Sequence, residues 1–255
     1  MLLPIGDDNR DRKRTPLVNY SLIAINILVF IFWQHYGLDV RTMFAYATVP
    51  GEILTGQDIV TPGQVLVDPY TGNTFEMPGL QPTGVPVYLT LITSMFLHGG
   101  WAHLGGNMLY LAICGDNLED ALGHWNYLVF YLLCGCLAGL SHVFATLLLG
   151  QNLLIPSMGA SGAISAVLGG YIVLFPRKHI YIWMLFFIIA VPALVVVGLW
   201  FVFQVINGFG ALGGQEAGGV AYAAHIGGFL SGMLLVRRFA RKYLALRSGA
   251  TRRYR

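Results

Sequence analysis

The sequence has 255 residues, of which 56% are hydrophobic and only 11% are charged, and its formal net charge is +3. Soluble domains carry about 25% charged residues, so too few polar side chains are present to cover a water-soluble globule of this size. The composition excludes an ordinary soluble protein and predicts a membrane protein.

Six apolar segments are long enough, or nearly so, to cross the hydrocarbon layer, which takes about 20 residues of helix. In chain order they are Leu17–Tyr36, Leu104–Leu122, Trp125–Leu149, Ser157–Phe175, Ile180–Phe203 and Val220–Phe239. The second carries Asp116, Glu119 and Asp120 in its last turns, and the fifth contains Pro192, which predicts a kink. The sequence therefore predicts an all-α polytopic membrane protein with six transmembrane helices in one domain, residues 17–239.

The Lys and Arg residues predict the orientation. An even number of spans puts both termini on one side, and 14 of the 15 cations then share that side, with Arg41 alone opposite. Cytoplasmic segments are enriched in Lys and Arg, so residues 1–16 and 240–255 are predicted to be basic cytoplasmic tails at a plasma (inner) membrane. The second tail is expected to lie against anionic lipid, since no folded domain accompanies the charges to favour nucleic acid.

One connection is long. Residues 37–88 form an external loop that is rich in Gly and Pro and too long to be slack between two helices. The loop is predicted to pack on the outer membrane face as a collar or a substrate-facing structure. The alternative is a mobile insert without a role.

Polar side chains gather at one depth of the predicted bundle. The second, fourth and sixth spans run inward, and their outer halves contain His103, Asn107, Ser161 and His225. Polar groups inside a bilayer are costly, so each is a candidate for function. A single serine or histidine in a span more often serves packing, but the convergence of four polar residues from three helices predicts a site.

Small residues predict how two of these helices meet. His225, Gly228 and Gly232 share one face of the sixth span, and the two glycines form a small-xxx-small contact. The matching stripe on the fourth span consists of Ser161, Ser165 and Gly169. Packing the stripes together would bring His225 against Ser161, although helix packing alone would also account for the glycines.

These residue types suit nucleophilic catalysis. A serine hydroxyl needs a base, which neutral His225 provides, and Ser161 stands at a helix start, where free N–H groups favour developing negative charge. His103 and Asn107, one turn apart, are candidate donors to an oxyanion. No Asp or Glu lies at this depth, so the sequence predicts a dyad and not a triad. His98 is expected to cap or brace the second span.

The same residues carry a family resemblance. Gly159-Ala160-Ser161-Gly162 resembles the GxSG motif of rhomboid intramembrane serine proteases, and His103-x-x-x-Asn107 resembles the motif of their second helix. Ala224-His225-Ile226-Gly227-Gly228-x-x-x-Gly232 resembles the motif of their last helix, and the stretch from Gly115 to Asp120 resembles the end of their second helix. The likeness covers residues 90–235.

The resemblance implies a rhomboid-like bundle in which Ser161 is the nucleophile, His225 is the base, and His103, Asn107 and the Ser161 N–H form the oxyanion hole. It implies cleavage of single-span membrane proteins near the outer face, through an acyl-enzyme, and a fifth helix with a neighbouring loop (here the Gly-rich run 208–219) that gates substrate entry. Gly159, Gly162, Gly228 and Gly232 are expected to be structural residues near the site. No metal, cofactor, nucleotide or nucleic acid is expected.

Two departures from the family pattern stand out. Family members often carry Tyr or Phe four residues after the serine, stacked on the catalytic histidine, where this chain has Ser165. Many also have a Trp-Arg pair in the first loop, whereas no Trp here is followed by Arg. The orientation of His225 and the fold of the loop therefore do not follow from the family pattern.

Three other functions compete with a protease. A catalytically silent rhomboid-like protein that binds membrane clients usually lacks the serine or the histidine, and both are present here. A transporter would show paired broken helices or ionisable groups at mid-membrane. A zinc protease would show H-E-x-x-H, which the sequence lacks.

Overall fold

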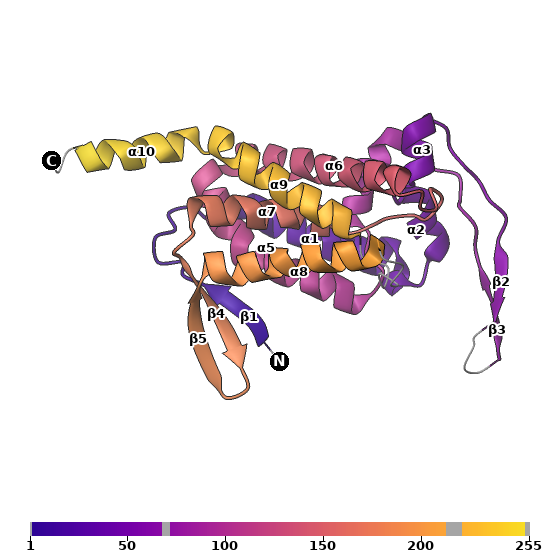
Figure 1. Cartoon of the computed structure of the whole chain (residues 1–255), viewed down its shortest axis with the longest axis horizontal. Coiled ribbons are helices and arrows are strands. Elements are labelled where there is room, and N and C mark those ends of the chain that lie inside the picture. Colours follow the sequence, from indigo (N-terminus) through magenta and orange to yellow (C-terminus); the bar gives the residue numbers. More distant parts are fainter. Residues whose placement is uncertain (1, 68–71, 213–220, 253–255) are drawn as a thin grey trace.

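The computed structural model describes residues 2–67, 72–212 and 221–252. Its longer helices are α1 (Leu17–Leu28), α5 (Trp101–Leu122), α6 (His124–Leu148), α7 (Ser161–Leu174), α8 (Ala193–Leu212), α9 (Tyr222–Phe239) and α10 (Arg241–Arg252). Shorter elements are α2 (Val40–Tyr46), α3 (Pro50–Thr55), α4 (Thr90–Thr93) and five strands, β1 (Leu2–Asp7), β2 (Gln64–Val67), β3 (Thr74–Met77), β4 (His179–Met184) and β5 (Phe187–Pro192). Figure 1 shows a helical bundle with β1, β4, β5 and α10 at one end and α2, α3 and the β2–β3 hairpin at the other.

Helices overlap all six predicted spans. The first span is α1 continued by a π-helical turn, Val29–Trp33, and it ends where His35 and Tyr36 adopt positive φ. By length and apolar composition, two helices qualify as membrane spans among the residues described, His124–Leu148 and Ala193–Gly210, while Leu17–Trp33 and Ser161–Leu174 are apolar but shorter. That all six segments cross a membrane therefore stays a prediction.

The prediction for the fifth span was wrong in its first half. Residues His179–Met184 and Phe187–Pro192 form an antiparallel hairpin instead of helix, and α8 begins only at Ala193. A short apolar run rich in Ile and aromatic residues fits a strand as well as a buried helix, and its periodicity does not separate the two. Pro192 ends a strand, where its missing N–H is tolerated, and does not kink a helix.

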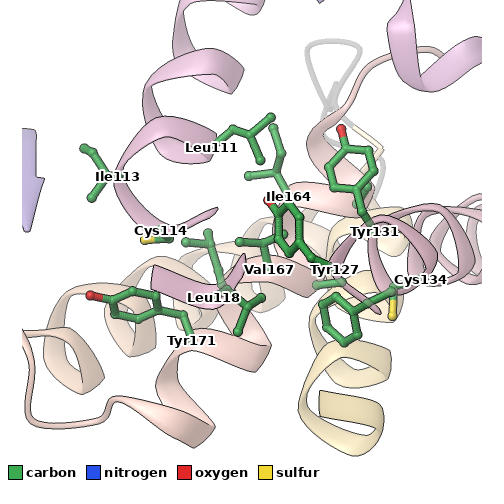
Figure 2. Close-up of a cluster of buried hydrophobic side chains, with 14 of the residues drawn as sticks. Leu111, Ile113, Cys114, Leu118, Tyr127, Tyr131, Cys134, Ile164, Val167 and Tyr171 are labelled. Atoms are coloured by element: carbon green, nitrogen blue, oxygen red, sulfur yellow. The ribbon is translucent and has the colours of Figure 1, made fainter. Parts of the chain in front are cut away.

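The hydrophobic core lies between α5, α6 and α7. Leu111 and Leu118 come from α5, Tyr127 and Tyr131 from α6, and Val167 from α7, and each of them is fully buried. Figure 2 shows the side chains of Leu118, Tyr127 and Val167 converging between the three helices. The surrounding helices pack against this centre, which fixes α7 at the middle of the bundle.

The acidic residues that weakened the second predicted span bind the start of the chain. Glu119 of α5 accepts hydrogen bonds from the backbone N–H groups of Val18 (3.0 Å) and Asn19 (2.7 Å), so it satisfies the free donors at the start of α1. Asp120 accepts from the Lys13 and Arg14 backbone, and Asp116 pairs with Arg12. These carboxylates anchor α1 to α5.

The N-terminal tail is only partly a free tail. Strand β1 pairs antiparallel with β4, and with β5 they form a three-stranded sheet in the order β1-β4-β5. Asp7, at the end of β1, is buried and accepts hydrogen bonds from Tyr171 of α7 and from Asn117 of α5 (2.7 Å for the latter). The sheet thus ties residues 2–7 to the segment that leads into α8.

Asp7 is expected to make stability depend on pH. Burial, reinforced by the charge of Asp116, raises the pKa of Asp7 from 3.8 to about 6 despite the hydrogen bond from Tyr171. Between about pH 4 and about pH 6, Asp7 keeps its proton in the folded protein but loses it in the unfolded chain. The free energy of unfolding therefore falls as pH rises through this window, by about 3 kcal/mol at most. Asp7→Asn should flatten this dependence in thermal unfolding of the detergent-solubilised protein.

The exposed Asp11→Asn change removes the same charge from the same segment and serves as control. In this variant, the melting temperature should change with pH between pH 4 and pH 6 as it does in the unchanged protein. If stability depends on pH in the same way for the unchanged protein and both variants, burial does not raise the pKa of Asp7.

The external loop has two different parts. Its first part, with α2 and α3, packs on the bundle: Met43, Val49 and Ile53 are buried, and Thr48 exchanges backbone hydrogen bonds of 2.9 and 2.8 Å with Ser157. The β2–β3 hairpin projects away from the bundle (Figure 1). The first part therefore resembles the predicted collar, and it lies against the segment that precedes Ser161.

Candidate active site

Ser161 and His225 meet between α7 and α9. Ser161 is the first residue of α7, and its Oγ lies 2.8 Å from His225 Nε2. Both side chains are half-buried. A hydroxyl and an imidazole nitrogen at this distance share a hydrogen bond, which is the geometry needed for the ring to take the hydroxyl proton.

Glycines allow the two helices to approach closely enough for this contact. A Cβ on Gly228 would collide with the Gly162 carbonyl oxygen, one on Gly232 with Ala166, and one on Gly169 with the Phe229 carbonyl. The small surface of α7 is therefore Gly162, Ala166 and Gly169, one residue further along than the predicted stripe at its first two positions. The predicted stripe was wrong at Ser165, which is buried and donates its hydroxyl to the Ser161 carbonyl (2.6 Å).

His103 approaches the same point from α5. Gly159 has φ +128°, and a Cβ built there would lie 2.8 Å from His103 Nε2, so only glycine suits this position. The Gly99 N–H donates to His103 Nδ1 (3.3 Å), which puts the ring proton on Nε2. The His103 N–H therefore faces the Gly159–Ser161 turn and is available to a ligand.

Asn107 and His98 lie on either side of His103 along the chain. Asn107 is buried, and its Nδ2 donates to the His103 carbonyl (3.0 Å) with one of its two hydrogens. His98 is fully buried just before α5, its ring 5.1 Å from the His103 ring, and Gln34 bonds its backbone N–H (3.0 Å) and carbonyl (2.9 Å). Gln34 thus braces the entry to α5.

One residue at the site was missing from the sequence prediction. Gln204 of α8 is 5% exposed, and its Oε1 lies 2.7 Å from His225 Nδ1. Trp200, one turn earlier on α8, lies with its ring 6.1 Å from the His225 ring. The signal that could have found Gln204 is that amides interrupt an otherwise apolar helix only at Gln204 and Asn207.

Two further expectations concern what surrounds the site. Within the described residues, no group of three His, Cys, Asp or Glu side chains is arranged to hold a metal ion. Of the Gly-rich run 208–219, which was predicted to act in substrate entry, residues 213–219 lie outside the described residues. The part of the run that is described, 208–212, is the end of α8.

Comparison with known proteins places these residues in a familiar domain. Residues 86–242 match the Rhomboid domain, which is a polytopic helical membrane fold. The chain is 35% identical to Rhomboid protein 1, mitochondrial, of Saccharomyces cerevisiae over 156 residues, which is 61% of this chain and 43% of that protein. It is 34% identical to RHOMBOID-like protein 4 of Arabidopsis thaliana over 146 residues, 57% of this chain and 32% of that protein.

A third relative matches over a longer stretch. The chain is 25% identical to the human presenilin-associated rhomboid-like protein, mitochondrial, over 223 residues, 85% of this chain and 46% of that protein. The chain thus spans less than half the length of these relatives. Proteins with this domain reside in membranes, and they include both proteases and inactive members.

Proposed function

Because this chain belongs to the rhomboid family, we propose that it is an intramembrane serine endopeptidase that cleaves single-span membrane proteins near the outer membrane face. The observation that carries the proposal is the 2.8 Å hydrogen bond between Ser161 Oγ and His225 Nε2. The alternative is a catalytically silent family member that binds membrane clients. The presence of both residues, in hydrogen-bond contact, favours the enzyme.

In the first half of the reaction, His225 Nε2 takes the Ser161 proton as Oγ attacks the carbonyl carbon of the scissile peptide bond. The carbonyl electron pair moves to oxygen, and the resulting oxyanion accepts hydrogen bonds from the Ser161 N–H, the His103 Nε2–H and the Asn107 amide. The Ser161 N–H suits this role because the first N–H groups of a helix have no partner within the helix.

In the second half, the protonated His225 gives its proton to the leaving nitrogen and the C–N bond breaks, which leaves an acyl-enzyme on Ser161. A water then loses a proton to His225 and attacks the ester carbonyl. Collapse of this second oxyanion breaks the C–Oγ bond and returns the proton to Ser161. The reaction consumes one water and needs no metal or cofactor.

We also propose that the six helical segments all cross the bilayer and that both termini face the cytoplasm of a plasma (inner) membrane. The cations of residues 10–14, 177–178 and 237–242 belong to segments at the end of the bundle that carries β1, β4, β5 and α10 (Figure 1). The site lies toward the opposite end, at the start of α7. The location rests on this charge distribution and not on the relatives, two of which are named as mitochondrial.

The test is cleavage of a single-span membrane protein by the purified chain in liposomes, beside Ser161→Ala. The unchanged protein should cut, and the variant should release no product, because it has lost the nucleophile. The substrate should be offered in several sequences, so that a failure to cut does not depend on the residues around one scissile bond.

Failure of the unchanged protein on every substrate would support the silent client-binding alternative. Equal cleavage by both proteins would show that Ser161 is not the nucleophile. A fluorophosphonate probe that labels the unchanged protein but not the variant would give the same answer without a protein substrate.

A further inference from the structure

The support for His225 comes from an unexpected helix. An aromatic side chain on α7 would have stacked on the ring, but Ser165 occupies that position and bonds back to its own helix. The ring is instead held from α8, where Gln204 Oε1 lies 2.7 Å from Nδ1. His225 is therefore bonded at both nitrogens, by Ser161 on one side and Gln204 on the other.

Aromatic contacts hold α8 in register with α9. Phe201 stacks on Phe229 with ring centroids 4.1 Å apart, and Trp200 lies beside both Phe229 and His225. Trp200, Phe201 and Gln204 share one face of α8, because residues three and four apart are neighbours on a helix. This packing aims the Gln204 amide at the ring of His225.

The opposite face of α8 is apolar and exposed, with Leu199, Val202, Phe203 and Ile206 more than half exposed. A buried amide is costly in this setting unless it is bonded. The other amide of the helix, Asn207, is half-buried and donates to the Phe203 carbonyl of its own helix (2.7 Å). The two amides of α8 thus differ in what they serve.

The chemistry of the contact concerns the position of one proton. A neutral imidazole carries its proton on one nitrogen only, and a base toward Ser161 must have Nε2 free. The Gln204 oxygen can only accept a hydrogen bond, so it favours the form with the proton on Nδ1. We propose, on the premise of the protease function, that Gln204 is a positioning residue that holds His225 in the tautomer and orientation in which Nε2 is the base.

Because the Gln204 amide is neutral, it can orient the His225 ring but cannot stabilise the positive charge of the protonated ring as a carboxylate would. When His225 takes the Ser161 proton, Gln204 keeps its hydrogen bond to Nδ1 but adds no negative charge. A carboxylate at the same position would keep the acceptor and also favour the charged ring. The other titratable groups around His225 are His103 of α5, His142 of α6 and Tyr222 of α9, which the substitutions below leave in place.

The experiment compares four variants in liposomes, with kcat and KM for a single-span substrate measured from about pH 5 to about pH 9. Gln204→Leu removes the acceptor with little change in size, and should lower kcat about 10- to 100-fold with KM within about twofold. Gln204→Glu should retain more of kcat than Gln204→Leu and move the acid limb of the pH profile up by about one unit. Asn207→Leu, the matched amide on the same helix, should stay within about twofold of the unchanged protein.

Ser161→Ala separates failure of this inference from failure of the proposed function. If the unchanged protein cuts no better than Ser161→Ala, the protease function itself is wrong. If it cuts, and Gln204→Leu cuts equally well, Gln204 does not position the base. If Gln204→Leu loses activity together with thermal stability while Gln204→Glu leaves the acid limb unmoved, the residue serves packing only, and the inference is overturned.

Discussion

His225→Ala is expected to lower kcat by about 10³-fold or more, and combining it with Ser161→Ala should cost nothing further. Without the imidazole at 2.8 Å, the Ser161 hydroxyl keeps its proton and is a poor nucleophile. Without the hydroxyl, the base has no proton to take. Two groups that act as one unit give equal single and double losses, and initial rates with excess enzyme would measure all three variants on one scale.

His142→Ala is the matched control, since it removes a histidine from the apolar helix α6, outside the dyad. It should keep most of the unchanged protein's rate. If the double variant instead loses as much activity as the two single variants combined, Ser161 and His225 act in separate steps. The prediction of a dyad would then be wrong.

Gly232→Ala is expected to lower both the stability of the fold and its activity. The added Cβ would lie 2.6 Å from Ala166 Cα, closer than real Cβ contacts, so α7 and α9 would have to separate. Overpacking of this kind costs about 1–3 kcal/mol of stability. Replacing glycine by alanine in a helix gains about 1 kcal/mol of helix propensity, which offsets only the lower end of that cost. Because Gly232 and His225 lie on one face of α9, separation of the two helices would also lengthen the contact between His225 and Ser161. The melting temperature and the cleavage rate should therefore fall together.

Gly198→Ala makes the same change on α8, where an added Cβ meets nothing within 4 Å. It should leave the melting temperature unchanged or slightly raised. If Gly232→Ala and Gly198→Ala melt alike, the close approach of α7 and α9 is not what holds the bundle together.

The sequence allowed much of the site to be predicted because depth in a membrane is a strong constraint. Ser161, His103 and His225 each lie at or near the start of an apolar segment that is predicted to run inward, so a shared depth was expected from counting residues. The close packing of α7 and α9 was likewise predicted from glycines at helical spacing. The one-residue error in the α7 stripe arose because serine and glycine are both small, and size alone does not say which of them faces a neighbour.

What was missed depends on contacts between distant residues. Strand β1 pairs with residues more than half the chain away, which no local pattern reveals. The apolar run of β4 and β5 was taken for helix, so the fifth span was placed too early and ended at Phe203, one residue before Gln204. Because the position of one helix was predicted wrongly, a contact of the candidate site was missed.

The three-stranded sheet also dictates an order of assembly. Leu2 and Leu3 of β1 are synthesised well before their partners Met184 and Trp183 of β4, because a chain grows at about 5–20 residues per second. An apolar strand therefore waits, unpaired, for roughly 10 to 35 s of synthesis. Since β5 runs directly into α8, the sheet closes at the base of the helix that carries Gln204, and β1 can pair only after β4 has been made.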